Sequence, residues 1–111
     1  MYSGTPLPSS EEKSEQEKID VCRDAISEID ADICSALVRR VAFANEIAHL
    51  KQELSVNLES PVQEAVVTER ARDRVGNDAP QVRGIKPLFK AILDFSKLNQ
   101  KINLESAEYE D

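Results

Sequence analysis

Two cations in a long helical stretch are the residues of this chain whose spacing most clearly indicates chemistry. Arg40 and Lys51 are eleven residues apart, which is roughly three turns of a helix, so both side chains lie on one face. Two positive charges on one stripe are suited to binding a small anion. Arg23 precedes Arg40 by seventeen residues, points to another face and lies roughly 25 Å away along the axis. Because Arg23 cannot reach the same anion in cis, the spacing favours a second copy of the chain.

The element that must position these cations is one long amphipathic helix. From about Ser14 to Leu54 the sequence has no Gly and no Pro, and apolar residues recur at three- and four-residue steps. Ser14 and Glu17 predict a capping box at its start. Such a helix would measure about 60 Å, whereas a compact chain of this length has a radius of gyration of about 13 Å. A monomer would leave apolar surface uncovered, so we expect a dimer.

Two shorter helices should follow. The segment Ser60–Gln63 is a strong helix start, with Ser as N-cap and Pro at the first position, and we expect this helix to stop at Gly76–Asn77. We expect Asp78 to cap a short helical turn, and a third helix to restart near Pro87. The predicted fold class is therefore all-α, with three helices per chain and a very long N-terminal helix.

Composition limits the architecture and the partners. The 111 residues are enough for one small domain, and 5% aromatic content with no Trp favours a helical core of Ile, Leu, Val and Ala. A formal net charge of −7 argues against a nucleic-acid partner. We expect a disordered tail over residues 1–14, one helical domain over 15–105 and an acidic, frayed tail over 106–111.

The cysteines and apolar runs indicate a reducing, aqueous location. Cys22 and Cys34 are the only cysteines, and at roughly 18 Å apart on one helix they cannot bridge within the chain. No CxxC pattern is present, so we expect no metal, and no other cofactor is implied. No apolar run approaches the roughly 20 residues of a membrane span, and no signal peptide is visible, so we expect no membrane partner and a cytoplasmic location.

Polar side chains interrupt the faces that should be buried. Ser96 and Gln100 form an i, i+4 pair on the third predicted helix. Buried cations are rarely left unpaired, so either Glu64 or a carboxylate ligand should pair with the cations of the first helix. The complete set of such polar residues is Arg23, Arg40, Lys51, Glu64, Ser96 and Gln100.

Four segments carry a family resemblance: Arg23–Asp30 (RDAISEID), Val38–Ala44 (VRRVAFA), Ile47–Lys51 (IAHLK) and Leu88–Gln100 (LFKAILDFSKLNQ). Their order and spacing resemble the all-helical chorismate mutases, over about residues 15–104. The resemblance implies an intertwined homodimer with two equivalent active sites and a dicarboxylate substrate.

The resemblance also implies a role for each polar residue. Arg23 would be donated in trans to the partner's site. Arg40, Lys51, Glu64, Ser96 and Gln100 would serve their own site. Lys51, Gln100 and Arg40 would be the catalytic residues: Lys51 and Gln100 would donate to the ether oxygen of chorismate, and Arg40 would pair with a substrate carboxylate. Ser96 would contact a substrate carboxylate, and Glu64 would accept a hydrogen bond from the ring hydroxyl.

The chain departs from the family pattern at two positions. Many members have an Asp where this chain has Ser60 and an Arg where it has Gln63, in the part of the pocket that reads the C4 substituent. A same-scaffold enzyme for an analogue, such as an aminodeoxychorismate mutase or an isochorismate-pyruvate lyase, is therefore an alternative. A non-catalytic helical dimerisation or regulatory module is a third hypothesis.

Overall fold

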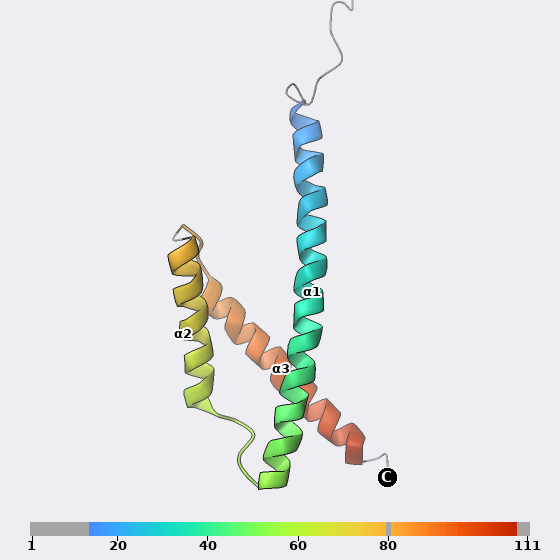
Figure 1. The fold of residues 1–111 in the computed structure, drawn as a ribbon, viewed down its shortest axis with the longest axis vertical. Coiled ribbons are helices and arrows are strands. Elements are labelled where there is room, and N and C mark those ends of the chain that lie inside the picture. The colour runs from blue at the N-terminus through green and yellow to red at the C-terminus, as the bar shows by residue number, and fades with distance from the viewer. Residues whose placement is uncertain (1–13, 80, 109–111) are drawn as a thin grey trace, which may run out of the picture. The chain divides into compact units, whose positions relative to one another are not determined.

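The chain forms three α-helices, as shown by a computed structural model that describes residues 14–79 and 81–108 (Figure 1). In order they are α1 (Glu15–Leu54), α2 (Pro61–Asp78) and α3 (Ile85–Glu108), and the described residues contain no strand. The prediction of an all-α fold with a long first helix is confirmed. The chain divides into two compact units, one ending at Leu37 and the other beginning at Val38. Apart from Ser14, the expected N-terminal tail lies outside the described residues, as do residues 109–111 of the expected C-terminal tail.

Local chemistry sets both ends of the 40-residue α1. At its start, the backbone N–H of Glu17 donates to Ser14 Oγ over 3.2 Å, and the Ser14 N–H donates to Glu17 Oε1 over 3.3 Å. This reciprocal pair confirms the predicted capping box. At its end, Ser55 adopts a left-handed conformation with φ +56°, and the Val56 N–H donates to the Lys51 carbonyl over 3.0 Å. That is a Schellman motif built without glycine.

The start of α2 was predicted correctly, and its end was not. Ser60 is the N-cap, and its hydroxyl accepts from the Gln63 N–H over 3.3 Å, with Pro61 in the first turn. The helix continues through Gly76 to Asp78 instead of stopping at Gly76–Asn77. Gly76 does not take the left-handed conformation that ends a helix and lies in the last turn of α2, so the predicted stop falls one residue short of the observed end.

A turn, and no short helix, connects α2 to α3 among the described residues. The Val82 N–H donates to the Ala79 carbonyl over 2.9 Å, and Gly84 takes φ +85° where the chain enters α3. The helix begins at Ile85, so Pro87 falls in its first turn, where a missing N–H removes no helical bond. The expected restart near Pro87 is therefore confirmed, whereas the short helical turn before it is not found.

Little apolar surface is buried among the described residues of a single chain. In the second unit, Ala48 and Ala71 are buried, whereas Phe43 is 72% exposed and Val62 is 77% exposed. In the first unit, the apolar stripe that includes Ile26 and Ile33 is about half exposed. Within the described part of the chain, no helix is long and apolar enough to cross a membrane. The described helices thus present apolar faces that one copy of the chain leaves uncovered.

Candidate functional site

Five of the six predicted site residues line one pocket of about 200 Å³ in the second unit. They come from all three helices: Arg40 and Lys51 from α1, Glu64 from α2, and Ser96 and Gln100 from α3. The remaining lining residues are Ala44, Ile47, Leu58, Ser60, Gln63, Val67, Leu93 and Lys97. The tertiary structure therefore gathers residues that are up to 60 positions apart in the sequence.

Arg40 is anchored by Ser96 across α1 and α3. A guanidinium N–H of Arg40 donates to Ser96 Oγ over 2.6 Å, and Ser96 is only 5% exposed. The bond gives the buried hydroxyl a partner and holds one end of the guanidinium group against α3. Because a guanidinium has five N–H donors, this bond leaves a pair of donors available to a carboxylate.

Lys51 is tied to the loop between α1 and α2. Its ammonium group donates to the backbone carbonyl of Leu58 over 3.1 Å, and its side chain is half-buried. One such bond leaves two of the three ammonium donors free. Lys51 therefore holds the loop against the pocket and can still donate to a ligand.

Gln100 is oriented by a backbone carbonyl of α1. Its amide Nε2 donates to the Ala44 carbonyl oxygen over 2.7 Å. A carbonyl can only accept, so this contact identifies which end of the amide faces Ala44. The second N–H of the same amide nitrogen has no hydrogen-bond partner among the described residues, and it is the donor that Gln100 can offer to a ligand.

Glu64 is paired with a lysine that the sequence analysis did not select. The ammonium group of Lys97 lies 3.3 Å from Glu64 Oε1, 3.6 Å from Glu59 Oε1 and 3.8 Å from Asp94 Oδ1. The hydrogen bond with Glu64 is the main reason that the pKa of Lys97 lies above its ordinary value. Of the two partners considered for the cations of the first helix, Glu64 pairs with Lys97 instead, which leaves the carboxylate ligand. Lys97 directly follows Ser96 in the sequence, and its position next to a predicted site residue was the signal that could have identified it.

Of four further residues, two lie in the pocket lining and two lie outside it. Ser60 and Gln63, the two departures from the family pattern, both line the pocket. Arg23 belongs to the first unit, is exposed, and makes no hydrogen bond or ion pair to the described residues. His49, the one histidine of the sequence, lies outside the pocket lining, and its Nε2 is 2.7 Å from Asn103 Oδ1.

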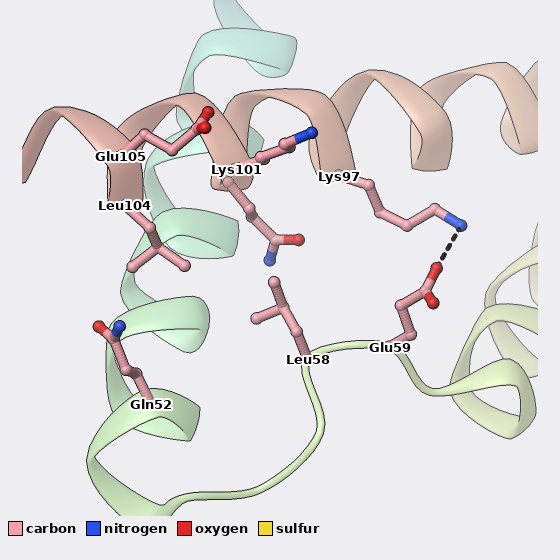
Figure 2. Close-up of a pocket in the computed structure, with 8 residues that line it drawn as sticks. Gln52, Leu58, Glu59, Lys97, Lys101, Leu104 and Glu105 are labelled. Carbon is pink, nitrogen blue, oxygen red and sulfur yellow. Dashed lines mark ion pairs between the residues drawn. The ribbon is translucent and has the colours of Figure 1, made fainter.

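A second hollow of about 390 Å³ adjoins the pocket and shares Leu58, Lys97 and Gln100 with it. Figure 2 shows this hollow between the loop that carries Leu58 and Glu59 and the face of α3 that carries Lys97. The dashed line in Figure 2 joins Lys97 to Glu59. Lys97 therefore stands at the border of two hollows, with Glu59 and Glu64 as its partners.

The described residues contain no group of three or more His, Cys, Asp or Glu side chains that could hold a metal ion. What the pocket offers is hydrogen-bond donors and charge: two α1 cations, an amide N–H, and a carboxylate paired with a lysine. Such a set can bind an anion with two carboxylates and stabilise negative charge that develops on another oxygen of the same ligand.

Comparison with known proteins gives the family of the chain. Residues 22–101 match the family described as chorismate mutase type II. The chain is 28% identical over 93 residues to a curated protein named chorismate mutase from Methanocaldococcus jannaschii, an alignment that covers 83% of this chain and 93% of that protein. No solved structure matches the chain.

Proposed function

The chain belongs to the chorismate mutase type II family, and from that premise we propose how its pocket converts chorismate to prephenate. The observation that carries the proposal is the convergence of Arg40, Lys51, Glu64, Ser96 and Gln100 on one hollow of about 200 Å³. The reaction is an intramolecular Claisen rearrangement in which a carbon–oxygen bond breaks as a carbon–carbon bond forms. The protein contributes by holding the compact conformer and stabilising the polarised transition state.

The two carboxylates of chorismate are matched by cations. Arg40 offers a bidentate pair of N–H donors whose direction is set by the 2.6 Å bond to Ser96. Because Ser96 lies beside the Arg40 guanidinium, its hydroxyl can donate to the same substrate carboxylate that Arg40 binds. Arg23 supplies the second guanidinium from the partner chain.

Lys51 and Gln100 stabilise the breaking ether bond. Negative charge grows on the ether oxygen in the transition state, so donors aimed at it accelerate the reaction. Lys51 keeps two ammonium donors beyond its bond to Leu58, and Gln100 keeps one N–H beyond its bond to Ala44. Because the Gln100 amide is neutral, its contribution does not depend on pH.

Glu64 accepts the hydrogen bond of the ring hydroxyl. Its side chain is 31% exposed, and it pairs with Lys97 through one oxygen, Oε1. A carboxylate has lone pairs for several donors, so the Lys97 bond and a substrate hydroxyl are compatible. This assignment places the C4 end of the substrate beside α2, with Ser60 and Gln63 in the same pocket lining.

The functional unit in this proposal is an intertwined homodimer. Support comes from the uncovered apolar faces, including Phe43 and the α1 stripe that contains Ile26 and Ile33. Support also comes from Arg23, which is exposed and has no hydrogen-bond or ion-pair partner among the described residues. A partner chain would cover these apolar faces and would receive Arg23 in its own pocket. Free thiols at Cys22 and Cys34 support a cytoplasmic location.

Product identification tests the activity. Purified protein is incubated separately with chorismate, isochorismate and aminodeoxychorismate. We expect prephenate from chorismate, and Arg40→Ala serves as the control that removes a pocket cation. Pyruvate release from isochorismate without prephenate formation would indicate the lyase alternative, and preferred turnover of aminodeoxychorismate the analogue mutase. Absence of any turnover would leave a non-catalytic helical module.

Mixing two inactive variants tests the shared site. Chains carrying Arg23→Ala are unfolded and refolded together with chains carrying Arg40→Ala. A heterodimer then has one site that lacks both arginines and one site that is intact, so about a quarter of the wild-type activity should return at equal, random mixing. If heterodimers form and activity stays at the level of the separate variants, the trans assignment of Arg23 is wrong.

A further inference from the structure

Lys97 is the one lysine of α3 in the pocket lining. Its ammonium group lies 3.3 Å from Glu64, and the two side chains are 36% and 31% exposed. Its other partners, Glu59 and Asp94, are farther away and are 67% and 57% exposed. Water screens those two pairs more strongly, so Glu64 is the dominant partner of Lys97.

Lys97 offsets the charge of Glu64, the one carboxylate in the pocket lining. Arg40, Lys51 and Lys97 are cations and Glu64 is the one carboxylate in the lining, which leaves a net charge of +2. Chorismate carries two carboxylates and an uncharged hydroxyl at C4. Together Lys97 and Glu64 carry no net charge, which matches a C4 substituent that is itself uncharged.

We propose that Lys97 is a specificity-determining residue, which neutralises Glu64 and thereby selects a substrate with an uncharged C4 hydroxyl over one with a C4 ammonium group. The inference rests on the proposed function, in which Glu64 faces the C4 substituent.

The selection follows from electrostatics. A lone carboxylate attracts an ammonium group more strongly than a hydroxyl, because only the former carries a charge. An ammonium group placed at Glu64 would also approach the Lys97 ammonium, which lies 3.3 Å from the same carboxylate. A hydroxyl meets no such repulsion. Gln63 lines the same pocket and is neutral, so Lys97 supplies the opposing charge beside Glu64.

The charge of Lys97 is secure under physiological conditions. Hydrogen bonding to Glu64 raises the pKa of Lys97 above its ordinary value, so the side chain stays protonated at neutral pH. The C4 amine of aminodeoxychorismate is an aliphatic amine and is protonated there as well. Both charges needed for the discrimination are therefore present in an assay at pH 7.

A charge-removing substitution with a matched control tests the proposal. Lys97→Met keeps the aliphatic stem and removes the ammonium group. Lys101→Met removes the same charge one turn later on α3, at an exposed residue that lines only the neighbouring hollow. Lys97→Arg keeps the charge. For each dimeric protein we measure the Ki of aminodeoxychorismate as an inhibitor and the KM of chorismate, and we compare the ratio of Ki to KM.

We expect Lys97→Met to lower the ratio of Ki to KM about tenfold, the scale of one charge interaction at a half-exposed site. Lys97→Arg and Lys101→Met should keep the wild-type ratio, and circular dichroism should show the same helix content in all four proteins. A merely structural role would weaken both ligands together. The proposal is overturned if the ratio in Lys97→Met is unchanged, or if Lys101→Met shifts it equally.

The proposed activity and the proposed role of Lys97 can be rejected independently of each other. If the wild-type protein does not convert chorismate, the proposed function fails, and the dissociation constants of both compounds can then be measured by calorimetry without turnover. The ratio of those constants tests the Lys97 selection in the same four proteins. A ratio that falls in Lys97→Met alone would support the selection by Lys97. The same ratio in all four proteins would reject it.

Discussion

Replacing Gln100 by Leu separates the two bonds that its amide nitrogen can make. One N–H is donated to the Ala44 carbonyl over 2.7 Å, and the proposal assigns the other to the ether oxygen of the transition state. Leucine has a similar size and no donor. The substitution should therefore affect both the stability of the fold and the rate, by amounts that can be estimated independently.

The expected loss of stability is small. Ala44 lies inside α1, so its carbonyl keeps its helical hydrogen bond when the amide is removed, and no buried acceptor is left unpaired. The cost is then about 1 kcal/mol, the net value of one hydrogen bond. For a domain of this size that lowers the Tm by about 4–8 °C, measured by thermal unfolding at a fixed chain concentration.

The expected loss of rate is much larger. Removing one donor from a developing oxyanion costs about 2.7–4 kcal/mol, which corresponds to a fall in kcat of about 100- to 900-fold. We would measure kcat by following chorismate consumption at 25 °C, well below the unfolding transition. The rate loss should appear while the helix content remains that of the wild type.

Asn99→Leu is the matched control. The Asn99 amide also donates to a helix carbonyl, that of Phe95, over 2.9 Å, but Asn99 lies outside the pocket lining. Because the Asn99 bond is exposed and local, this variant should change in stability by less than about 1 kcal/mol and keep its kcat within about threefold of the wild type. If Gln100→Leu shows the same small change in kcat as Asn99→Leu, Gln100 does not donate to the transition state and the assignment is refuted.

Three further predictions concern the pocket and its supports. Ser96→Ala removes the buried hydroxyl that fixes Arg40, so the KM of chorismate should rise about tenfold in steady-state kinetics; an unchanged KM would mean that Ser96 does not orient Arg40. Ser55→Gly relieves the left-handed strain at φ +56° and should stabilise the fold by up to about 1 kcal/mol in chemical denaturation; destabilisation would contradict the assigned Schellman motif. The pKa of Lys97 is raised, chiefly by its hydrogen bond to Glu64, so its favourable contribution is fully present below the ordinary value of 10.5 and is lost only as the pH rises through the higher folded value. The Tm difference between wild type and Lys97→Met should therefore be constant from about pH 6 to 9 and disappear above pH 10.5; a difference that disappears below pH 9 would be inconsistent with the Glu64 contact.

Helix boundaries were predictable where they depend on neighbouring residues. The Ser14 capping box and the Ser60 N-cap followed by Pro61 are short-range signals, and both appear in the structure. The end of α2 was missed because glycine is only permissive: it can end a helix or continue one, and Gly76 continues it. The end of α1 shows the converse, since Ser55 takes the left-handed position without any glycine signal.

The sequence by itself determined the three-helix fold and the shared face of Arg40 and Lys51, because helical periodicity and capping act over a few residues. Only the tertiary structure decided what each side chain faces. It brings α3 to α1, so that Gln100 meets the Ala44 carbonyl, and α3 to α2, so that Lys97 meets Glu64. In the sequence Lys97 is an ordinary lysine of an amphipathic helix. Its pairing spans 33 residues, and contacts of that separation are set by how helices pack, which no local pattern specifies.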